Sequence, residues 1–308
     1  MANKDAVTKQ LTSNNAYFAD LFNHLLFHEE LIDPDQLSPL NSDEIFLHRQ
    51  TGTSKEKIRD ILKQANIKTD RKCTYVCLGI ENQSSVDRNM PVRVMLYDAL
   101  SYDGQITRSK ANPEKRNNAV KTGLRPVITL VIYWGSRRWN APRSIKDMID
   151  PDIPDALKTY ISDYPIHLIS LQDLSDDSLR QLKTDISIVF EILKYSNNRN
   201  KMRKYIQDER FSSIPYDIAQ SINILADMDL KIEKDDKGKT DMCEGLKQLL
   251  KEERAEGLAK GKVEGKAEER AEIVGNMISY FLYAGKTEEE AKAEAQKILS
   301  WNSSSYSS

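Results

Sequence analysis

The feature that most limits the fold is a continuous apolar run, VITLVIYWG, at residues 127 to 135. It is rich in β-branched residues, so it predicts a β-strand. Because the run does not alternate with polar residues, both faces of the strand should be buried, as in a sheet covered by helices on each side. Two further segments, TYVCLGIENQ (74 to 83) and IHLISL (166 to 171), predict other strands of that sheet.

Helical segments lie between and after these strands. Apolar residues recur at helical spacing in residues 14 to 32, and a second helix is expected to begin at Met90, with Pro91 in its first turn. Residues 175 to 196 and 200 to 211 also predict helices, whereas residues 58 to 67 fit either a helical face or a bent strand. Strands interspersed in this order with helices predict an α/β fold, without the regular alternation of a doubly wound sheet.

The last part of the chain has a different character. From about residue 245 it consists almost entirely of helix-forming and charged residues, with Gly257, Gly261 and Gly265 at every fourth position. Such spacing marks a membrane dimer face only in an apolar stretch, so a solvated helix or a weak self-association segment is expected. Residues 273 to 299 predict a helical hairpin, whose second helix would begin with a capping box of Thr287 and Glu290.

Composition excludes several classes of protein. Three cysteines argue against a disulfide framework. No window approaches ~18 consecutive apolar residues, so no membrane span is expected. The N-terminus lacks an apolar signal region, and a cytoplasmic location is expected. The net charge of −2 indicates that any basic surface must be local.

Polar residues end the strand at residues 74 to 83. Side chains alternate along a strand, so Glu81 and Gln83 should share one face, and Gly79 leaves room beside them. Mg²⁺ is bound through one or two carboxylates, waters and substrate phosphate. A hairpin would bring Asp60 alongside Glu81 as the second carboxylate. The spacing is also compatible with a surface carboxylate and an ordinary strand end.

Several blocks of the chain together resemble a known family. They are FADLFNHLLF, IRDILK, GIENQSSV, MPVRVMLYDAL and PVITLVIYWGSRRWNAPRSIKDMID. In this order they are similar to the recombination-promoting nuclease/putative transposase (Rpn) family, a branch of the PD-(D/E)XK nucleases, over about residues 10 to 250. The resemblance implies a restriction-endonuclease-like core with a mixed central sheet flanked by helices. It also implies DNA cleavage that depends on Mg²⁺ or another divalent cation, such as Mn²⁺ or Ca²⁺.

The resemblance also assigns roles to individual residues. Asp60 and Glu81 match the two metal-binding acids, and Gln83 matches the position where many PD-(D/E)XK enzymes have lysine. Glutamine can orient a water molecule, but it has no charge and cannot act as a general base. Asp20 is a further candidate metal ligand on the first helix, with a helix-surface acid as the alternative. Lys63 should point to the opposite face of its strand from Asp60.

Basic residues predict where DNA would bind. One cluster in residues 108 to 125 includes Arg108, Lys110, Lys115, Arg116 and Lys121, and a second includes Arg137 and Arg138. Lysine and arginine contacts to phosphate supply most of the non-specific affinity for DNA. Arg93 and Tyr97 lie one turn apart on the helix that follows the acidic strand, where they would either contact phosphate or anchor the helix surface. A solvated loop is the alternative for both clusters.

The resulting expectation is a metal-dependent DNA endonuclease associated with recombination or mobile elements. A nuclease fold retained as a nucleic-acid-binding or assembly module is the alternative, because Gln83 replaces lysine. The nuclease-like domain should span residues 1–210, a helical extension and linker residues 211–250, and a charged helical tail with a small hairpin residues 251–308. Homo-oligomers would form through the tail.

Overall fold

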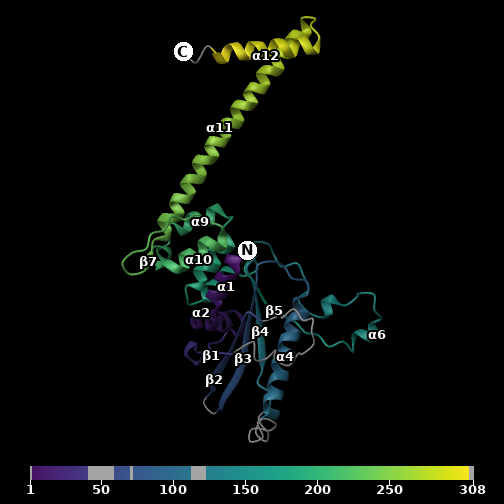
Figure 1. Ribbon diagram of the computed structural model, residues 1–308, viewed down its shortest axis with the longest axis vertical. Coiled ribbons are helices and arrows are strands. Elements are labelled where there is room, and N and C mark those ends of the chain that lie inside the picture. The colour runs from purple at the N-terminus through teal and green to yellow at the C-terminus, as the bar shows by residue number, and fades with distance from the viewer. Residues whose placement is uncertain (1, 41–58, 70–71, 112–122, 305–308) are drawn as a thin grey trace. The chain divides into compact units, whose positions relative to one another are not determined.

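The chain folds into two compact units, one that ends at Gly245 and one that begins at Leu246. The computed structural model describes residues 2–40, 59–69, 72–111 and 123–304 (Figure 1). The three-part division with boundaries at residues 210 and 250 stays a prediction.

A five-stranded mixed sheet forms the centre of the first unit. Its strands lie in the order β1 (Leu37–Pro39), β2 (Ile61–Thr69), β3 (Lys72–Gln83), β4 (Val127–Tyr133) and β5 (His167–Ser170). The pairs β1–β2 and β2–β3 are antiparallel, whereas the pairs β3–β4 and β4–β5 are parallel. The expected α/β class with a mixed central sheet is therefore confirmed, and the ambiguous segment before residue 67 is a strand.

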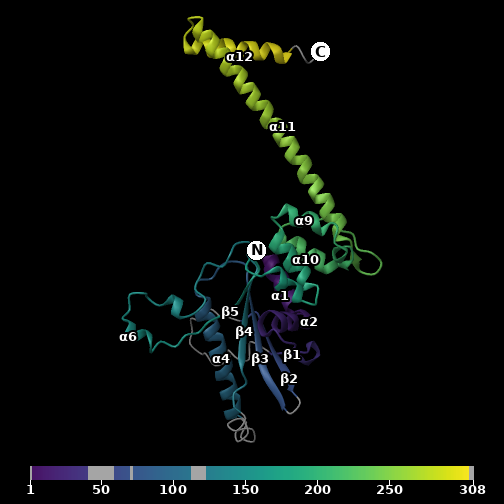
Figure 2. The ribbon, with the colours of Figure 1, turned by 180° about the vertical axis from the view of Figure 1, so that it is seen from behind.

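Helices lie on both faces of this sheet, as Figures 1 and 2 show. Helices α1 (Ala2–Ser13) and α2 (Asn15–Asp20) cover one face, and α4 (Met90–Ala111) covers the other. On the α4 side, Met90 and Val94 pack against Val131 and Tyr133 of β4. All of β4 is buried except Ile128, which is partly buried, as its continuous apolar sequence predicts.

The segment expected to form one helix over residues 14 to 32 is shorter and irregular. Helix α2 continues into a π-helix, Leu21–Phe27, which ends at His28 in the left-handed conformation with φ of 55°. The side-chain oxygen of Asn23 then accepts the backbone N–H groups of Leu31 and Ile32, at 3.1 and 2.8 Å. This amide turns the chain back before the short 3-10 turn Pro34–Gln36, so the apolar spacing does not correspond to one long helix.

Shorter helices complete the first unit. The helix expected over residues 175 to 196 is divided into α7 (Asp176–Gln181) and α8 (Ile186–Tyr195). The helix expected over residues 200 to 211 corresponds to α9 (Arg199–Tyr205), followed by a 3-10 turn at Glu209–Phe211. The sequence interpretation missed α1, whereas α10 (Tyr216–Ala226) lies within residues 211–250, where a helical extension was expected. Other elements are α6 (Asp155–Lys158), the 3-10 turn Lys146–Met148, and the small sheet of β6 (Ile214–Pro215) and β7 (Lys239–Thr240).

Two helices form most of the second unit. Helix α11 (Met242–Tyr283) begins just before the unit boundary, and α12 (Glu288–Ser304) follows a turn. The predicted capping box is confirmed, since the Thr287 N–H donates to Glu290 Oε2 at 2.9 Å and the Glu290 N–H donates to Thr287 Oγ1 at 3.4 Å. Among the helices described, none has the length and apolar character that a membrane crossing requires.

Candidate active site

Two acidic residues meet where β2 begins and β3 ends. Ile61 pairs with Ile80 in the antiparallel ladder, so Asp60 lies beside Glu81. The backbone N–H of Asp60 donates to Glu81 Oε1 at 3.3 Å, and the backbone N–H of Asn82 donates to Asp60 Oδ2 at 2.9 Å. The β2–β3 hairpin therefore brings together the two carboxylates that the sequence analysis paired.

Burial makes negative charge costly at this position. Glu81 is only 1% exposed. Burial, and secondly the charge of Asp60, raises the pKa of Glu81 to about 8, although Arg93 and Arg59 oppose the shift. Burial also raises the pKa of Asp60, against the opposing effects of the Asn82 N–H and of Lys9. Two adjacent carboxyl groups supply oxygen donors of the kind that a divalent cation binds, and a bound cation would favour their ionised form against the effect of burial.

Arg93 supplies part of the balancing charge. It lies in the first turns of α4, with Nη2 at 3.2 Å from Glu81 Oε2 and Nη1 at 2.7 Å from Asp87 Oδ2. Nη2 also donates to the hydroxyl of Tyr97 at 3.4 Å. The structure thus places Arg93 and Tyr97 at the acidic pair, where the guanidinium is partly exposed and close enough to Glu81 to influence any ligand there.

A second, buried arginine fills the space beside Gly79. A Cβ atom at Gly79 would lie 2.7 Å from Cδ of Arg59, so the room expected beside Glu81 is occupied by this side chain. Arg59 Nη2 donates to Asp98 Oδ1 at 2.5 Å, and Asp98 also accepts from the hydroxyl groups of Thr129 and Tyr164. The sequence interpretation missed this network. Its only sequence signals are Gly79 within a strand and Asp98 within an apolar helix face.

Lysine 63 lies on the other face of the sheet, as expected. Its ammonium donates to the Ser13 carbonyl and to Asn15 Oδ1, both at 2.6 Å, and lies 4.7 Å from the ring centre of Phe18. Burial lowers the pKa of Lys63 to about 8. Lys63 therefore anchors α1 and α2 to β2 and does not substitute for a lysine at position 83.

The residue between the two site positions of β3 also faces away. Asn82 donates from Nδ2 to Thr12 Oγ1 at 2.9 Å and accepts from Trp134 Nε1 at 2.9 Å. Gln83, which follows Asn82, is half-buried at the end of β3, and its carbonyl accepts the Trp134 N–H at 2.9 Å. Gln83 lies two residues after Glu81 on β3, so the two side chains are on the same face of the strand, as expected. A role of Gln83 in orienting water stays a prediction.

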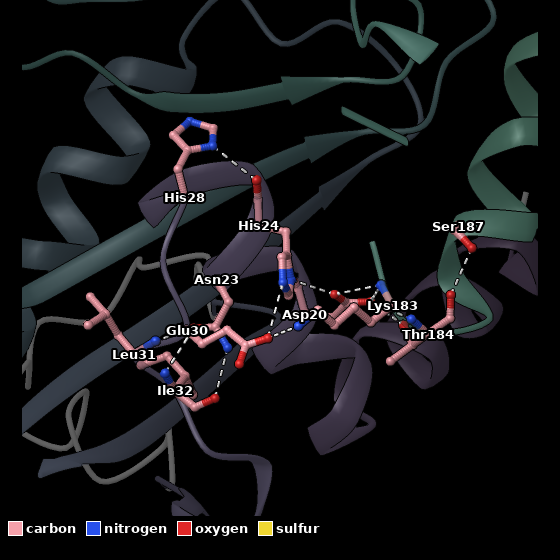
Figure 3. Close-up of polar contacts among 10 residues, drawn as sticks. All are labelled: Asp20, Asn23, His24, His28, Glu30, Leu31, Ile32, Lys183, Thr184 and Ser187. Carbon is pink, nitrogen blue, oxygen red and sulfur yellow. Dashed lines mark hydrogen bonds and ion pairs between the residues drawn. The ribbon is translucent and has the colours of Figure 1, made fainter. Parts of the chain in front are cut away.

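Asp20 belongs to a separate polar cluster, drawn in Figure 3. Its carboxylate accepts the backbone N–H groups of Lys183 and Thr184 and the Thr184 hydroxyl, and it pairs with His24 Nδ1 at 2.7 Å. These contacts hold the chain just before α8, and neither Asp60 nor Glu81 is among them. The structure therefore does not bring Asp20 to the acidic pair.

The histidines near Asp20 contact residues of their own segment. His28 Nδ1 lies 3.1 Å from the His24 carbonyl, and His24 Nε2 lies 3.6 Å from Glu30 (Figure 3). Within the described residues, no group of three or more His, Cys, Asp or Glu side chains is arranged to hold a metal ion. A cavity of about 550 Å³ lies beside this cluster, and its lining includes Asp20, His24 and Lys183 but not the acidic pair.

Comparison with known proteins identifies the family. Residues 2–212 match the model of the family described as "Putative transposase, YhgA-like". The chain belongs to this family. The match confirms the resemblance to the Rpn family. It supports a transposase-like or recombination-associated function for this chain. No curated protein and no solved structure matches the chain.

The structure describes the two predicted basic clusters only in part. Lys115, Arg116 and Lys121 lie outside the described residues, and of Arg108 and Lys110 only the backbone, in α4, is described. Arg137 and Arg138 are exposed in the loop after β4. Arg138 Nε lies 3.7 Å from Asp173, and Arg143 also contacts Asp173, at 3.2 Å. Two tryptophans lie near this second cluster in sequence, and both serve packing, since Trp139 is buried against Tyr133 and Trp134 contacts Phe190.

Proposed function

We propose that this protein is a metal-dependent DNA endonuclease that hydrolyses phosphodiester bonds and acts in recombination or on mobile elements. The observation that supports this most directly is the Asp60–Glu81 pair, in which the backbone N–H of Asp60 bonds Glu81 and burial raises the pKa of both carboxyl groups. Mg²⁺, Mn²⁺ or Ca²⁺ would be held by Asp60 and Glu81, with waters and substrate phosphate as further ligands. Membership in the YhgA-like family supports DNA as the substrate.

Each nearby residue has a proposed role in that reaction. The bound cation would lower the pKa of its water and neutralise charge on the phosphate. Gln83 orients the attacking water through its amide and exchanges no proton. Arg93, already beside Glu81, contacts the phosphate from the rim. Asp20 is left out of the metal site, because its carboxylate is used by Lys183, Thr184 and His24.

The basic clusters complete the proposal by binding the DNA backbone outside the active site. We assign this role to Arg108, Lys110, Lys115, Arg116, Lys121, Arg137 and Arg138. Such contacts are independent of base sequence and weaken as salt rises.

Plasmid nicking in the presence of Mg²⁺ tests the proposal. We expect the unaltered chain to nick supercoiled DNA, and Glu81→Gln and Asp60→Asn to abolish nicking. Glu233→Gln is the matched control, since Glu233 is an exposed acid in the same unit. Nicking that persists in both site variants would refute the assignment.

A catalytically weak, nucleic-acid-binding or assembly module is the second candidate. Two observations favour it, namely the neutral Gln83 and the ion pair by which Arg93 occupies Glu81 Oε2. This candidate predicts salt-dependent DNA binding that does not change when divalent ions are chelated. Binding lost on chelation, together with Mg²⁺-dependent nicking, would favour the endonuclease.

We also propose that α11 forms antiparallel pairs between two copies of the chain. A Cβ added at Gly257, Gly261 or Gly265 would meet nothing within 4 Å, so contacts within the described chain do not explain these glycines. Each glycine costs a helix about 0.5–1 kcal/mol relative to alanine, and glycines permit close helix approach. In an antiparallel pair that crosses at Gly261, Arg254 would face Glu268 of the other copy. We expect Gly261→Leu to shift the chain to monomers in light scattering, and Ala259→Leu, at an exposed position on the other side of α11, to serve as the control. An unchanged mass would refute the pairing.

A further inference from the structure

A cavity of about 400 Å³ lies among helices α7, α8 and α9 of the first unit. Pockets that bind small ligands have volumes of about 300–1,000 Å³, and the lining of this one includes neither Asp60 nor Glu81. The charged residues of its lining are three cations and two acids, namely Arg180, Lys201, Arg210, Asp176 and Glu191. This excess of positive charge favours an anion as the ligand.

Both acids of the cavity are already paired within the protein. Glu191 is buried, and its two oxygens accept from Arg210 Nη1 and Nη2 at 2.9 and 3.1 Å. Asp176 accepts from Lys201 Nζ at 2.8 Å and from the hydroxyl of Tyr195. The negative charges are therefore balanced locally, and each acid also fixes a cation at the wall of the cavity.

Two of the cations retain donors for a ligand. Lys201 uses one of its three N–H groups on Asp176, and the described part of the chain shows no other hydrogen bond from its ammonium group. The Lys201 ammonium also lies 4.5 Å from the ring centre of Tyr195, which holds it in place. Arg180 pairs with Asp177 at 3.2 Å, but both side chains are exposed, so this pair is weak. Lys201 and Arg180 can thus bind an anion without breaking a buried pair.

Tyr205 gives the observation that points to a ligand. It lines the cavity and is only 7% exposed. Its backbone carbonyl accepts from Cys243, but among the described residues its hydroxyl has no hydrogen-bond partner. Such a group is costly to bury, and native proteins rarely leave one unpaired. Burial, and secondly the charge of Glu191, raises the pKa of Tyr205, so the hydroxyl keeps its proton and can donate it to an acceptor.

We propose that this cavity binds a phosphate group, to which Lys201 and Arg180 donate from the rim and Tyr205 donates from inside. A phosphate group offers oxygens on several sides, as donors from three different helical positions require, and hydrogen bonds between charged groups and its oxygens are strong. The phosphate group belongs either to a free ligand, such as a nucleotide, or to a DNA strand. The inference goes beyond the proposed function, because it involves neither the metal nor the cleavage reaction.

Calorimetric titration of the full chain with inorganic phosphate, at pH 7 and constant ionic strength, is the first test. We expect saturable binding by the unaltered chain. Lys201→Ala and Tyr205→Phe should each weaken it about tenfold or more, because each removes a hydrogen bond to a charged group. Arg203→Ala is the matched control and should bind as the unaltered chain does, since Arg203 is exposed on the other side of α9 from Lys201.

Tyr205→Phe separates a ligand contact from a structural role. The substitution keeps the ring and removes a hydroxyl that has no partner in the described chain. Without phosphate, therefore, the stability of the variant to chemical denaturation should equal or exceed that of the unaltered chain. A structural role predicts the opposite pair of results, namely a loss of stability and an unchanged affinity for phosphate. This variant also decides the question if Lys201→Ala fails to fold.

Two further titrations identify the source of the phosphate group. Thymidine monophosphate that binds more tightly than both inorganic phosphate and thymidine would indicate a nucleotide. A short DNA duplex, titrated in the presence of a chelator, would be indicated instead if its affinity fell in both Lys201→Ala and Tyr205→Phe but not in Arg203→Ala. The proposal is overturned if the unaltered chain does not bind inorganic phosphate, or if both site variants bind it equally well. Either failure would leave the acidic pair untouched, because plasmid nicking tests that site separately.

Discussion

Replacing Glu81 with glutamine should stabilise the protein at alkaline pH and leave its stability unchanged in acid. Glu81 is buried beside Asp60, and its pKa is raised from an ordinary 4.5 to about 8. Below pH 4.5 the carboxyl group is protonated in both the folded and the unfolded chain. Between the two values it ionises in the unfolded chain only, so the free energy of unfolding falls as pH rises. Glutamine remains neutral, so the variant escapes this loss.

The size of the effect follows from the two pKa values. Each pKa unit corresponds to about 1.36 kcal/mol, so the loss for the unaltered chain reaches about 5 kcal/mol by pH 8. Because Glu81 is 1% exposed, solvent does not screen this term. The pKa of about 8 already includes the opposing effect of Arg93, so the ion pair lost in the variant needs no separate correction. We therefore expect a gain of about 5 kcal/mol at pH 8, or roughly 10–20 °C in Tm for a unit of this size.

Thermal unfolding followed by circular dichroism at pH 4.5 and pH 8 measures this difference, with Glu233→Gln as the control at both values. Mg²⁺ adds a second comparison at pH 8. It should raise the Tm of the unaltered chain, because a ligand that binds only the folded state stabilises it, and it should not affect Glu81→Gln. A variant that is equally or less stable than the unaltered chain at pH 8 would refute the reasoning.

Two further substitutions test the surroundings of the site. Gly79→Ala places a Cβ 2.7 Å from Cδ of Arg59, so it should disturb the buried pair of Arg59 and Asp98 and lower the free energy of unfolding by about 2–4 kcal/mol in chemical denaturation. Gly257→Ala is the control and should give a small gain, because the added Cβ meets nothing. An equal effect of the two substitutions would contradict the close packing at Gly79. Asp20→Asn should lower the free energy of unfolding by about 2 kcal/mol, because the charge-assisted hydrogen bonds from Lys183 and Thr184 weaken. Its affinity for Mn²⁺, measured by calorimetry, should equal that of the unaltered chain. A tenfold loss of Mn²⁺ affinity would show that Asp20 belongs to the metal site.

Local patterns in the sequence were sufficient for the sheet and for the position of the acidic pair. The apolar run of β4 implied burial on both faces, and period-two alternation placed Glu81 apart from Asn82. A single polar turn between β2 and β3 was enough to suggest that Asp60 would meet Glu81. These inferences succeeded because strand periodicity and hairpin pairing depend on residues close in sequence.

Contacts between distant segments could not be predicted in the same way. The space beside Gly79 is filled by Arg59, whose partner Asp98 lies on α4, and nothing in the spacing of these residues indicates the contact. Asp20 was assigned by family resemblance, yet its partners are more than 160 residues away, before α8. Helix α1 is polar along much of its length and gave no clear apolar pattern, so its contact with β3 through Thr12 and Asn82 could not be predicted from the sequence.

Asn82 gives a warning for mutational scans of this protein. Its side chain joins Thr12 of α1 to Trp134 after β4, on the face of the sheet away from the acidic pair. A substitution there would loosen the backbone that positions Glu81 and Gln83, although no atom of the Asn82 side chain would meet a substrate. A screen for lost activity would therefore report three successive sensitive positions, and only the first and third would be informative about chemistry. Restoring activity by mutations in α1 or near Trp134 would be the genetic signature of the middle one.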